Sequence, residues 1–169
     1  RPDRACDQRK RDRAIIAEKK IAAVLTVEGG HQIDNDLAVL RMHRRLGVLS
    51  MTLTHFRSND WADSSTGKQE HNGLTEFGKQ VVLEMNRIGM IVDVSPVSDK
   101  AFYDVLQVTA KPVIASHSSC RSLSDVPRNM TDDMMRALAK NGGAVDVAFP
   151  AAFLNQKDAD PLKSPLPAP

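Results

Sequence analysis

The chain has 169 residues, which is enough for one domain with its own hydrophobic core. Its composition, 41% hydrophobic and 26% charged residues, is typical of a globular protein. A net charge of +2 and an aromatic content of 4% exclude a basic or base-stacking surface for nucleic acid, so we expect no nucleic-acid partner. No stretch approaches the ~20 apolar residues of a membrane span.

Apolar runs alternate with amphipathic segments along the chain. Because strands that alternate with helices pair in parallel through right-handed crossovers, this pattern predicts an α/β fold with about five parallel strands. We expect strands at 21–27, 48–54, 90–94, 113–116 and 144–149. We expect helices at 8–20, 36–46, 74–87, 100–109 and 131–140.

Five such strands suit a small doubly wound sheet or a part of a barrel. Polar residues follow three different strands and are not gathered at a single switch point of the sheet. This distribution favours a partial (β/α)8 TIM-type barrel over residues 1–155. A complete barrel usually takes ~250 residues, so we expect an incomplete one. Residues 156–169 contain four prolines among the last nine positions, which predicts an extended or disordered tail.

The acid and the two histidines that follow strands form the main candidate site. Glu28 ends the first apolar run before Gly29-Gly30, His55 follows the second, and His117 follows the fourth. The carboxyl ends of parallel strands share one edge, so we expect these three side chains to converge there. A carboxylate and two imidazoles are suitable ligands for a divalent ion such as zinc, and Glu28 has two oxygens with which to bridge two ions. Glu28 alone is more typical of a solvated loop acid, and its placement together with His55 and His117 is what favours a site.

Three further residues have a chemical and a structural interpretation. Arg128 precedes a predicted helix, where its guanidinium can clamp a substrate carboxylate or remain a surface group. Asp93 lies inside an apolar strand and therefore needs partners, which indicates a structural or supporting acid. Cys120 follows His117 closely and is either a nucleophilic thiol or a small buried residue.

The remaining histidines carry weaker predictions. His31 follows two glycines and is expected to anchor the turn or to support the site indirectly. His43 lies on a predicted helix between basic residues, which indicates the surface, and His71 lies in a polar loop, which indicates solvent exposure.

Several motifs in a fixed order give the chain a family resemblance. It resembles the renal (membrane) dipeptidases, the M19 family of zinc dipeptidases with amidohydrolase-like barrels, over about residues 20–154. The motifs are Val27-Glu28-Gly29-Gly30-His31, Met51-Thr52-Leu53-Thr54-His55, Trp61-Ala62-Asp63, Gly73-Leu74-Thr75-Glu76-Phe77-Gly78, Ile114-Ala115-Ser116-His117-Ser118-Ser119 and Arg128-Asn129.

The resemblance implies hydrolysis of dipeptides by two zinc ions. It implies that Glu28 bridges the two metals and that His117 is a ligand of the second. His55 matches the histidine that polarises the scissile carbonyl and steadies the developing oxyanion. Arg128 matches the arginine that binds the C-terminal carboxylate of the substrate.

The sequence also departs from the family pattern. Pro96, in Ser95-Pro96-Val97-Ser98, stands where the family has a second histidine ligand. No His-x-Asp pair precedes Glu28, and the late-barrel aspartate has no counterpart. We therefore expect a truncated or impaired dipeptidase, and the alternative is an inactive dipeptidase-like binding or interaction protein. Open strand edges further predict a possible homodimer.

Overall fold

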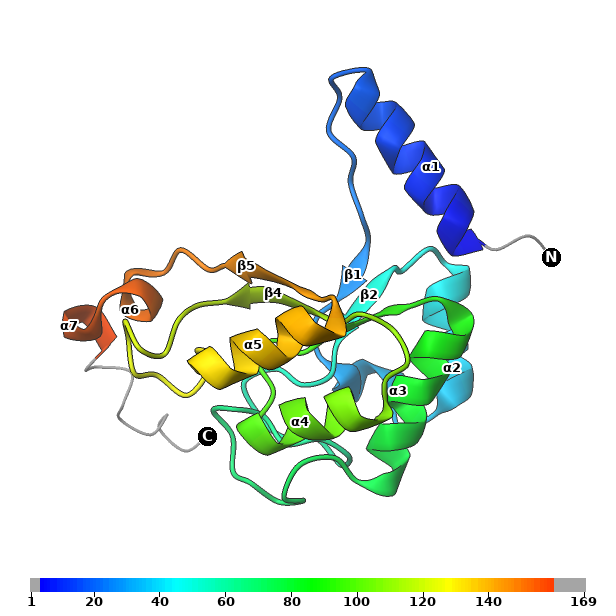
Figure 1. The fold of residues 1–169 in the computed structure, drawn as a ribbon. Coiled ribbons are helices and arrows are strands. Elements are labelled where there is room, and N and C mark those ends of the chain that lie inside the picture. Colours follow the sequence, from blue (N-terminus) through cyan, green and yellow to red (C-terminus); the bar gives the residue numbers. More distant parts are fainter. Residues whose placement is uncertain (1–3, 160–169) are drawn as a thin grey trace.

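The structure, a computed structural model, describes residues 4–159 and contains one five-stranded sheet with helices around it (Figure 1). The strands are β1 (Thr26–Val27), β2 (Ser50–Thr52), β3 (Ile91–Asp93), β4 (Ile114–Ser118) and β5 (Ala144–Val147). The helices are α1 (Arg4–Ala17), the short 3-10 helix η1 (Gly30–Ile33), α2 (Leu37–Arg45), α3 (Glu76–Ile88), α4 (Asp99–Val108), α5 (Asp132–Asn141), α6 (Ala151–Leu154) and α7 (Gln156–Ala159).

All neighbouring strands pair in parallel, in the order β1-β2-β3-β4-β5. Spatial order therefore follows chain order, as it does around a (β/α)8 barrel, whereas a doubly wound sheet reverses at a switch point. Met51 lies at the centre of the register, opposite Val27 on one side and Val92 on the other. The predicted α/β class and the partial-barrel arrangement are confirmed.

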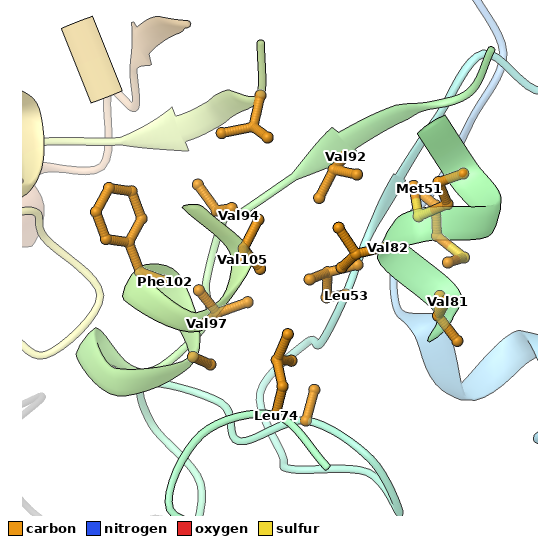
Figure 2. Close-up of a cluster of buried hydrophobic side chains, with 14 of the residues drawn as sticks. Met51, Leu53, Leu74, Val81, Val82, Val92, Val94, Val97, Phe102 and Val105 are labelled. Carbon is orange, nitrogen blue, oxygen red and sulfur yellow. The ribbon is translucent and has the colours of Figure 1, made fainter. Parts of the chain in front are cut away.

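The hydrophobic core lies between the strands and the helices that connect them. Figure 2 shows Met51 and Leu53 of the β2 segment and Val92 of β3 gathered near Val82 of α3 and Val105 of α4. All five side chains are at most 1% exposed. Full burial of a side chain of this size stabilises a fold by about 1.5–3 kcal/mol, so this layer fixes the strands that carry the candidate site.

Local capping residues define the ends of three helices. Thr75, Ser98 and Thr131 accept a backbone N–H at the N-termini of α3, α4 and α5. Gly89 and Gly142 end α3 and α5 with positive φ angles, which glycine adopts without strain.

Two strand boundaries differ from the prediction. Residues 21–25 lie outside the assigned strand, and β1 begins only at Thr26. Ile21 and Leu25 are 95% and 62% exposed, although the Leu25 carbonyl oxygen still accepts the Leu49 backbone N–H at 2.8 Å. β4 continues through Ser118, because Ser118 still pairs with Val147 of β5 after a register shift. His117 therefore lies within β4 and not after it.

Helices η1, α6 and α7 were not predicted. Helix α7 covers Gln156–Ala159, at the start of the segment that the proline content predicted to be extended or disordered, and residues 160–169 lie outside the described residues. Figure 1 shows α1 standing apart from α2 to α5. None of the helices between residues 4 and 159 has the length and apolar content required to cross a membrane.

Candidate active site

The carboxyl edge of the sheet brings three predicted residues together. Glu28 directly follows β1, His55 comes three residues after β2, and His117 lies in β4. The Glu28 Oε1 atom is 3.3 Å from Nε2 of His55 and 3.4 Å from Nε2 of His117. One carboxylate oxygen thus faces two imidazoles that come from strands on either side of β3.

These groups are open to solvent on one side. The Glu28 side chain is 54% exposed, and the imidazoles of His55 and His117 are 36% and 31% exposed. A substrate or an ion can therefore reach the space that the three groups border, while the backbone behind them belongs to the core.

The turn after β1 explains why Glu28 points to this edge. Gly29 has a φ of 107°, and its N–H donates to the Thr52 hydroxyl at 2.6 Å. A Cβ on Gly30 would collide with the Trp61 ring and with the Leu53 carbonyl oxygen. The glycine pair therefore permits a close approach to β2 that any side chain would prevent.

His31 lies beside this turn. Its ring lies against Gly29, where an added Cβ would collide with Cε1 of His31. Its side chain is exposed at the start of η1 and is not among the groups that pair with Glu28.

His117 is held through both its ring and its backbone. Its Nδ1 lies 2.8 Å from the Ser116 hydroxyl, and its backbone N–H donates to the Ser95 hydroxyl at 3.3 Å. Burial lowers the pKa of His117, and the positive charge of Arg128 lowers it further, while Asp93 and Glu28 oppose this change. The neutral imidazole, the form that binds a metal, is therefore favoured near neutral pH.

Arg128 lies next to this group. Its Nη2 donates to the His117 carbonyl oxygen at 3.1 Å, and its guanidinium carbon lies 4.4 Å from the centre of the Phe153 ring. Burial lowers the pKa of Arg128, and the Glu28 carboxylate opposes this change. The buried Nε of Arg128 has no hydrogen-bond partner in the described part of the chain.

Asp93 supports the site from inside β3. Its side chain is 3% exposed, and its Oδ1 accepts the backbone N–H groups of Ser95 at 3.0 Å and of Ser116 at 3.1 Å. Burial raises the pKa of Asp93, while hydrogen bonds from Ser116 and Ser95 and the charge of His117 lower it. The predicted need for partners is met by these hydrogen-bond donors.

Three other residues lie apart from this group. The prediction that His71 faces solvent is wrong, because this residue is half-buried and its Nε2 lies 2.8 Å from the Asn59 carbonyl oxygen. His43 Nε2 lies 3.5 Å from the Gln32 carbonyl oxygen. The Cys120 thiol contacts the Met135 sulfur at 3.9 Å, and a thioether is no base for a nucleophilic cysteine.

The sequence did not assign a role to Ser116, Ser95 or Phe153. The positions of Ser116 and Ser95 could have been noticed, since Ser116 adjoins His117 and Ser95 lies just after the end of β3. Phe153 gave no comparable signal, because it lies in the short helix α6 and reaches Arg128 only through the tertiary fold.

Comparison with known proteins places the chain in a class and then a family. The parallel strands in chain order define the class, a segment of a (β/α)8-type barrel. The chain belongs to the membrane dipeptidase family, peptidase family M19, whose model matches residues 6–164.

Curated relatives of the chain are longer proteins. The chain is 46% identical over 155 residues to an uncharacterized dipeptidase of Schizosaccharomyces pombe, covering 88% of this chain and 37% of that protein. It is 44% identical over 145 residues to human Dipeptidase 3, covering 83% of this chain and 30% of that protein. The chain thus spans about a third of the length of these relatives.

Solved structures share the fold. The probable dipeptidase PvdM of Pseudomonas aeruginosa superposes with a TM-score of 0.82 at 34% identity, covering 86% of this chain and 38% of that one. A metallo peptidase of Rhodobacter sphaeroides, liganded with a phosphinate mimic of the dipeptide L-Ala-D-Ala, gives a TM-score of 0.80 at 26% identity, covering 86% of this chain and 43% of that one. The resemblance to M19 dipeptidases is confirmed.

Proposed function

We propose that this chain carries part of the active site of a zinc-dependent dipeptidase, in which Glu28 and His117 are metal ligands. The observation that carries the proposal is the convergence of His55 and His117 on one oxygen of Glu28, at 3.3 and 3.4 Å. Membership of a metallopeptidase family supports the metal, and the mixed carboxylate and imidazole donors support zinc.

The donor types fit zinc, but their number does not. No group of three or more His, Cys, Asp or Glu side chains within residues 4–159 has the arrangement of a metal site. Catalytic zinc usually has three protein ligands, so Glu28 and His117 make an incomplete set. When bound, zinc supplies a Lewis acid and an activated water for amide hydrolysis. No step through the metal follows from the residues described.

The other two site residues have roles that do not depend on this count. His55 is placed to donate a hydrogen bond to the scissile carbonyl oxygen and to stabilise the charge that develops there. Arg128, held over Phe153 with its Nε unpaired within the described residues, is placed to bind the C-terminal carboxylate of a dipeptide. Together they orient a substrate across the group formed by Glu28 and His117.

A second candidate function is a dipeptidase-like binding or interaction protein without catalysis. The incomplete donor set within residues 4–159 favours it, as does Pro96, which offers no ligand at the end of β3. Such a protein would retain Arg128 and His55 for binding and would lack turnover.

Zinc titration and a hydrolysis assay separate these functions. We expect the metal-free chain to bind zinc in calorimetry, and we expect Glu28→Gln and His117→Gln to weaken zinc binding at least about tenfold. His43→Gln, which changes a histidine outside the site, is the matched control and leaves zinc binding unchanged.

Hydrolysis of L-Ala-D-Ala that depends on added zinc supports the dipeptidase. Binding of the phosphinate mimic of this dipeptide without turnover supports the second function. A chain that binds neither zinc nor the mimic contradicts both proposals.

A further inference from the structure

We infer that Arg121 is a positioning residue for Arg128: it holds the backbone on both sides of Arg128 and ties it to α4 through Asp99. Arg121 lies in the turn after β4. The consequence for ligand binding rests on the proposed function, in which Arg128 binds the C-terminal carboxylate of a dipeptide. The hydrogen bonds that hold the Arg128 backbone do not depend on that role.

The guanidinium of Arg121 binds the main chain before and after Arg128. Its Nη2 donates to the Pro127 carbonyl oxygen at 3.0 Å, and its Nε donates to the Asn129 carbonyl oxygen at 2.8 Å. The Arg128 carbonyl oxygen, which lies between these two in the chain, accepts from the Ser118 hydroxyl at 3.0 Å. Side chains thus bind three consecutive carbonyl groups, which fixes the backbone that carries the Arg128 side chain.

Asp99 ties Arg121 to helix α4. Nη1 and Nη2 of Arg121 donate to the two carboxylate oxygens of Asp99 at 2.6 and 2.7 Å, the geometry of a bidentate pair. Asp99 is the first residue of α4, which Ser98 caps by accepting the Ala101 N–H. Arginine suits this position because its planar group carries enough N–H donors to bind the carboxylate and both carbonyl oxygens at once. The loop that carries Arg128 is therefore joined to the helix that follows β3 in the chain.

The guanidinium of Arg128 has few restraints of its own. Within residues 4–159 it has one hydrogen bond, from Nη2 to the His117 carbonyl oxygen at 3.1 Å, and it lies over the Phe153 ring. A long side chain loses rotamer entropy when it is ordered, so a fixed backbone reduces the number of positions that its end can reach. Loss of Arg121 should therefore disorder Arg128 without removing any contact of the Arg128 side chain itself.

Nitrogen NMR of the full chain labelled with ¹⁵N-arginine tests the positioning without any ligand. The Nε–H signal of Arg128 is identified by its loss in Arg128→Lys. We expect a sharp signal in the wild-type chain and a broadened signal in Arg121→Ala, because the Arg128 backbone is no longer held. Arg136→Ala, which removes an exposed arginine that pairs with Asp133, is the matched control and should leave the signal unchanged. An unchanged signal in a folded Arg121→Ala overturns the inference.

Ligand binding tests whether this positioning matters for recognition. The probes are the phosphinate mimic of L-Ala-D-Ala and the same compound with its C-terminal carboxylate converted to an amide, each titrated into the metal-free chain by calorimetry. We expect the wild-type chain to prefer the carboxylate about 10- to 100-fold, and Arg121→Ala to lose most of this preference. A merely structural role of Arg121 would weaken binding of both compounds alike and keep the preference, and that outcome contradicts the inference.

Arg121→Lys carries the test if Arg121→Ala does not fold. Lysine keeps a positive charge next to Asp99, but its single ammonium group cannot reproduce the planar fork that reaches Asp99 and both carbonyl oxygens. We expect this variant to broaden the Arg128 signal and to lose part of the carboxylate preference. A wild-type signal together with the full wild-type preference in Arg121→Lys overturns the inference.

The two measurements separate failure of this inference from failure of the proposed function. A wild-type chain that binds the carboxylate and the amide equally well contradicts the proposed role of Arg128, and the NMR result then still decides whether Arg121 positions it. A wild-type preference that survives unchanged in Arg121→Ala contradicts the inference and leaves the proposed role of Arg128 supported.

Discussion

Glu84, a buried carboxylate between α2 and α3, offers a stability prediction that the structure makes quantitative. Its Oε1 accepts from Arg41 of α2 at 2.5 Å, and its two oxygens accept from Arg87, one turn later on α3, at 2.6 Å each. Its side chain is 9% exposed. These hydrogen bonds join the two helices next to β1, β2 and β3.

The pKa of Glu84 gives the size of the effect. Hydrogen bonds from Arg87 lower this pKa from 4.5 to about 2; burial opposes them, and Arg41 adds to them. Such a difference corresponds to about 3 kcal/mol between the folded and unfolded chain. Because Arg41 and Arg87 are 43% and 64% exposed, solvent screens the pairs, and we expect about 1–2 kcal/mol from Glu84.

The sign of the pH dependence follows from the lowered pKa. The stabilisation is fully present above pH 4.5 and is lost as the pH falls towards about 2. Urea unfolding at pH 7 should therefore show Glu84→Gln less stable than wild type by about 1–2 kcal/mol, and the difference should fall to about half or less at pH 3.

A second carboxylate on α3 provides the matched control. Glu76 pairs with Lys79 at 2.6 Å but is 84% exposed in the first turn of α3, so Glu76→Gln should change the urea midpoint much less than Glu84→Gln does. A loss of stability in Glu84→Gln that is the same at pH 7 and pH 3 would refute the electrostatic explanation. It would indicate that packing, not charge, carries the contribution of Glu84.

Two further predictions concern the site. Gly30→Ala should lower the free energy of unfolding, measured by urea titration, by about 1–3 kcal/mol, because the new Cβ meets Trp61 and the Leu53 carbonyl oxygen. An unchanged midpoint would contradict the close packing of the turn. Arg128→Ala should weaken binding of the phosphinate dipeptide mimic about 10- to 100-fold in calorimetry, since one charged hydrogen-bond partner is lost. Arg136→Ala, on the exposed face of α5, is the control. Equal effects of the two variants would argue against a carboxylate site at Arg128.

Much of the fold was predictable because its signals are local. Threonine and serine caps, terminating glycines and apolar spacing lie within a few residues of the helix ends that they define. The strand order was predictable because alternating strands and helices leave few parallel arrangements. The extent of β1 was not predictable, since residues 21–25 have the composition of a strand but lie outside it and are mostly exposed.

The candidate site also has a part that the sequence predicted and a part that it did not. Glu28, His55 and His117 were expected to converge because each follows or ends an apolar run, and the structure brings them together. Their roles as ligands and catalytic group stay predictions. The contact between Phe153 and Arg128 and the half-buried position of His71 depend on tertiary packing, for which the local sequence has no marker.

Strand β3, which lies between β2 and β4, shows how the candidate site depends on residues that do not border it. β3 is followed by Ser95 and Pro96, which bring no acid or imidazole to the edge, although the strands on both sides do so. β3 contributes from its interior instead, through Asp93, which is linked to His117 by Ser116. Ser95 also accepts the His117 backbone N–H, so the segment after β3 holds the main chain of that histidine, while Ser116 of β4 contacts its ring.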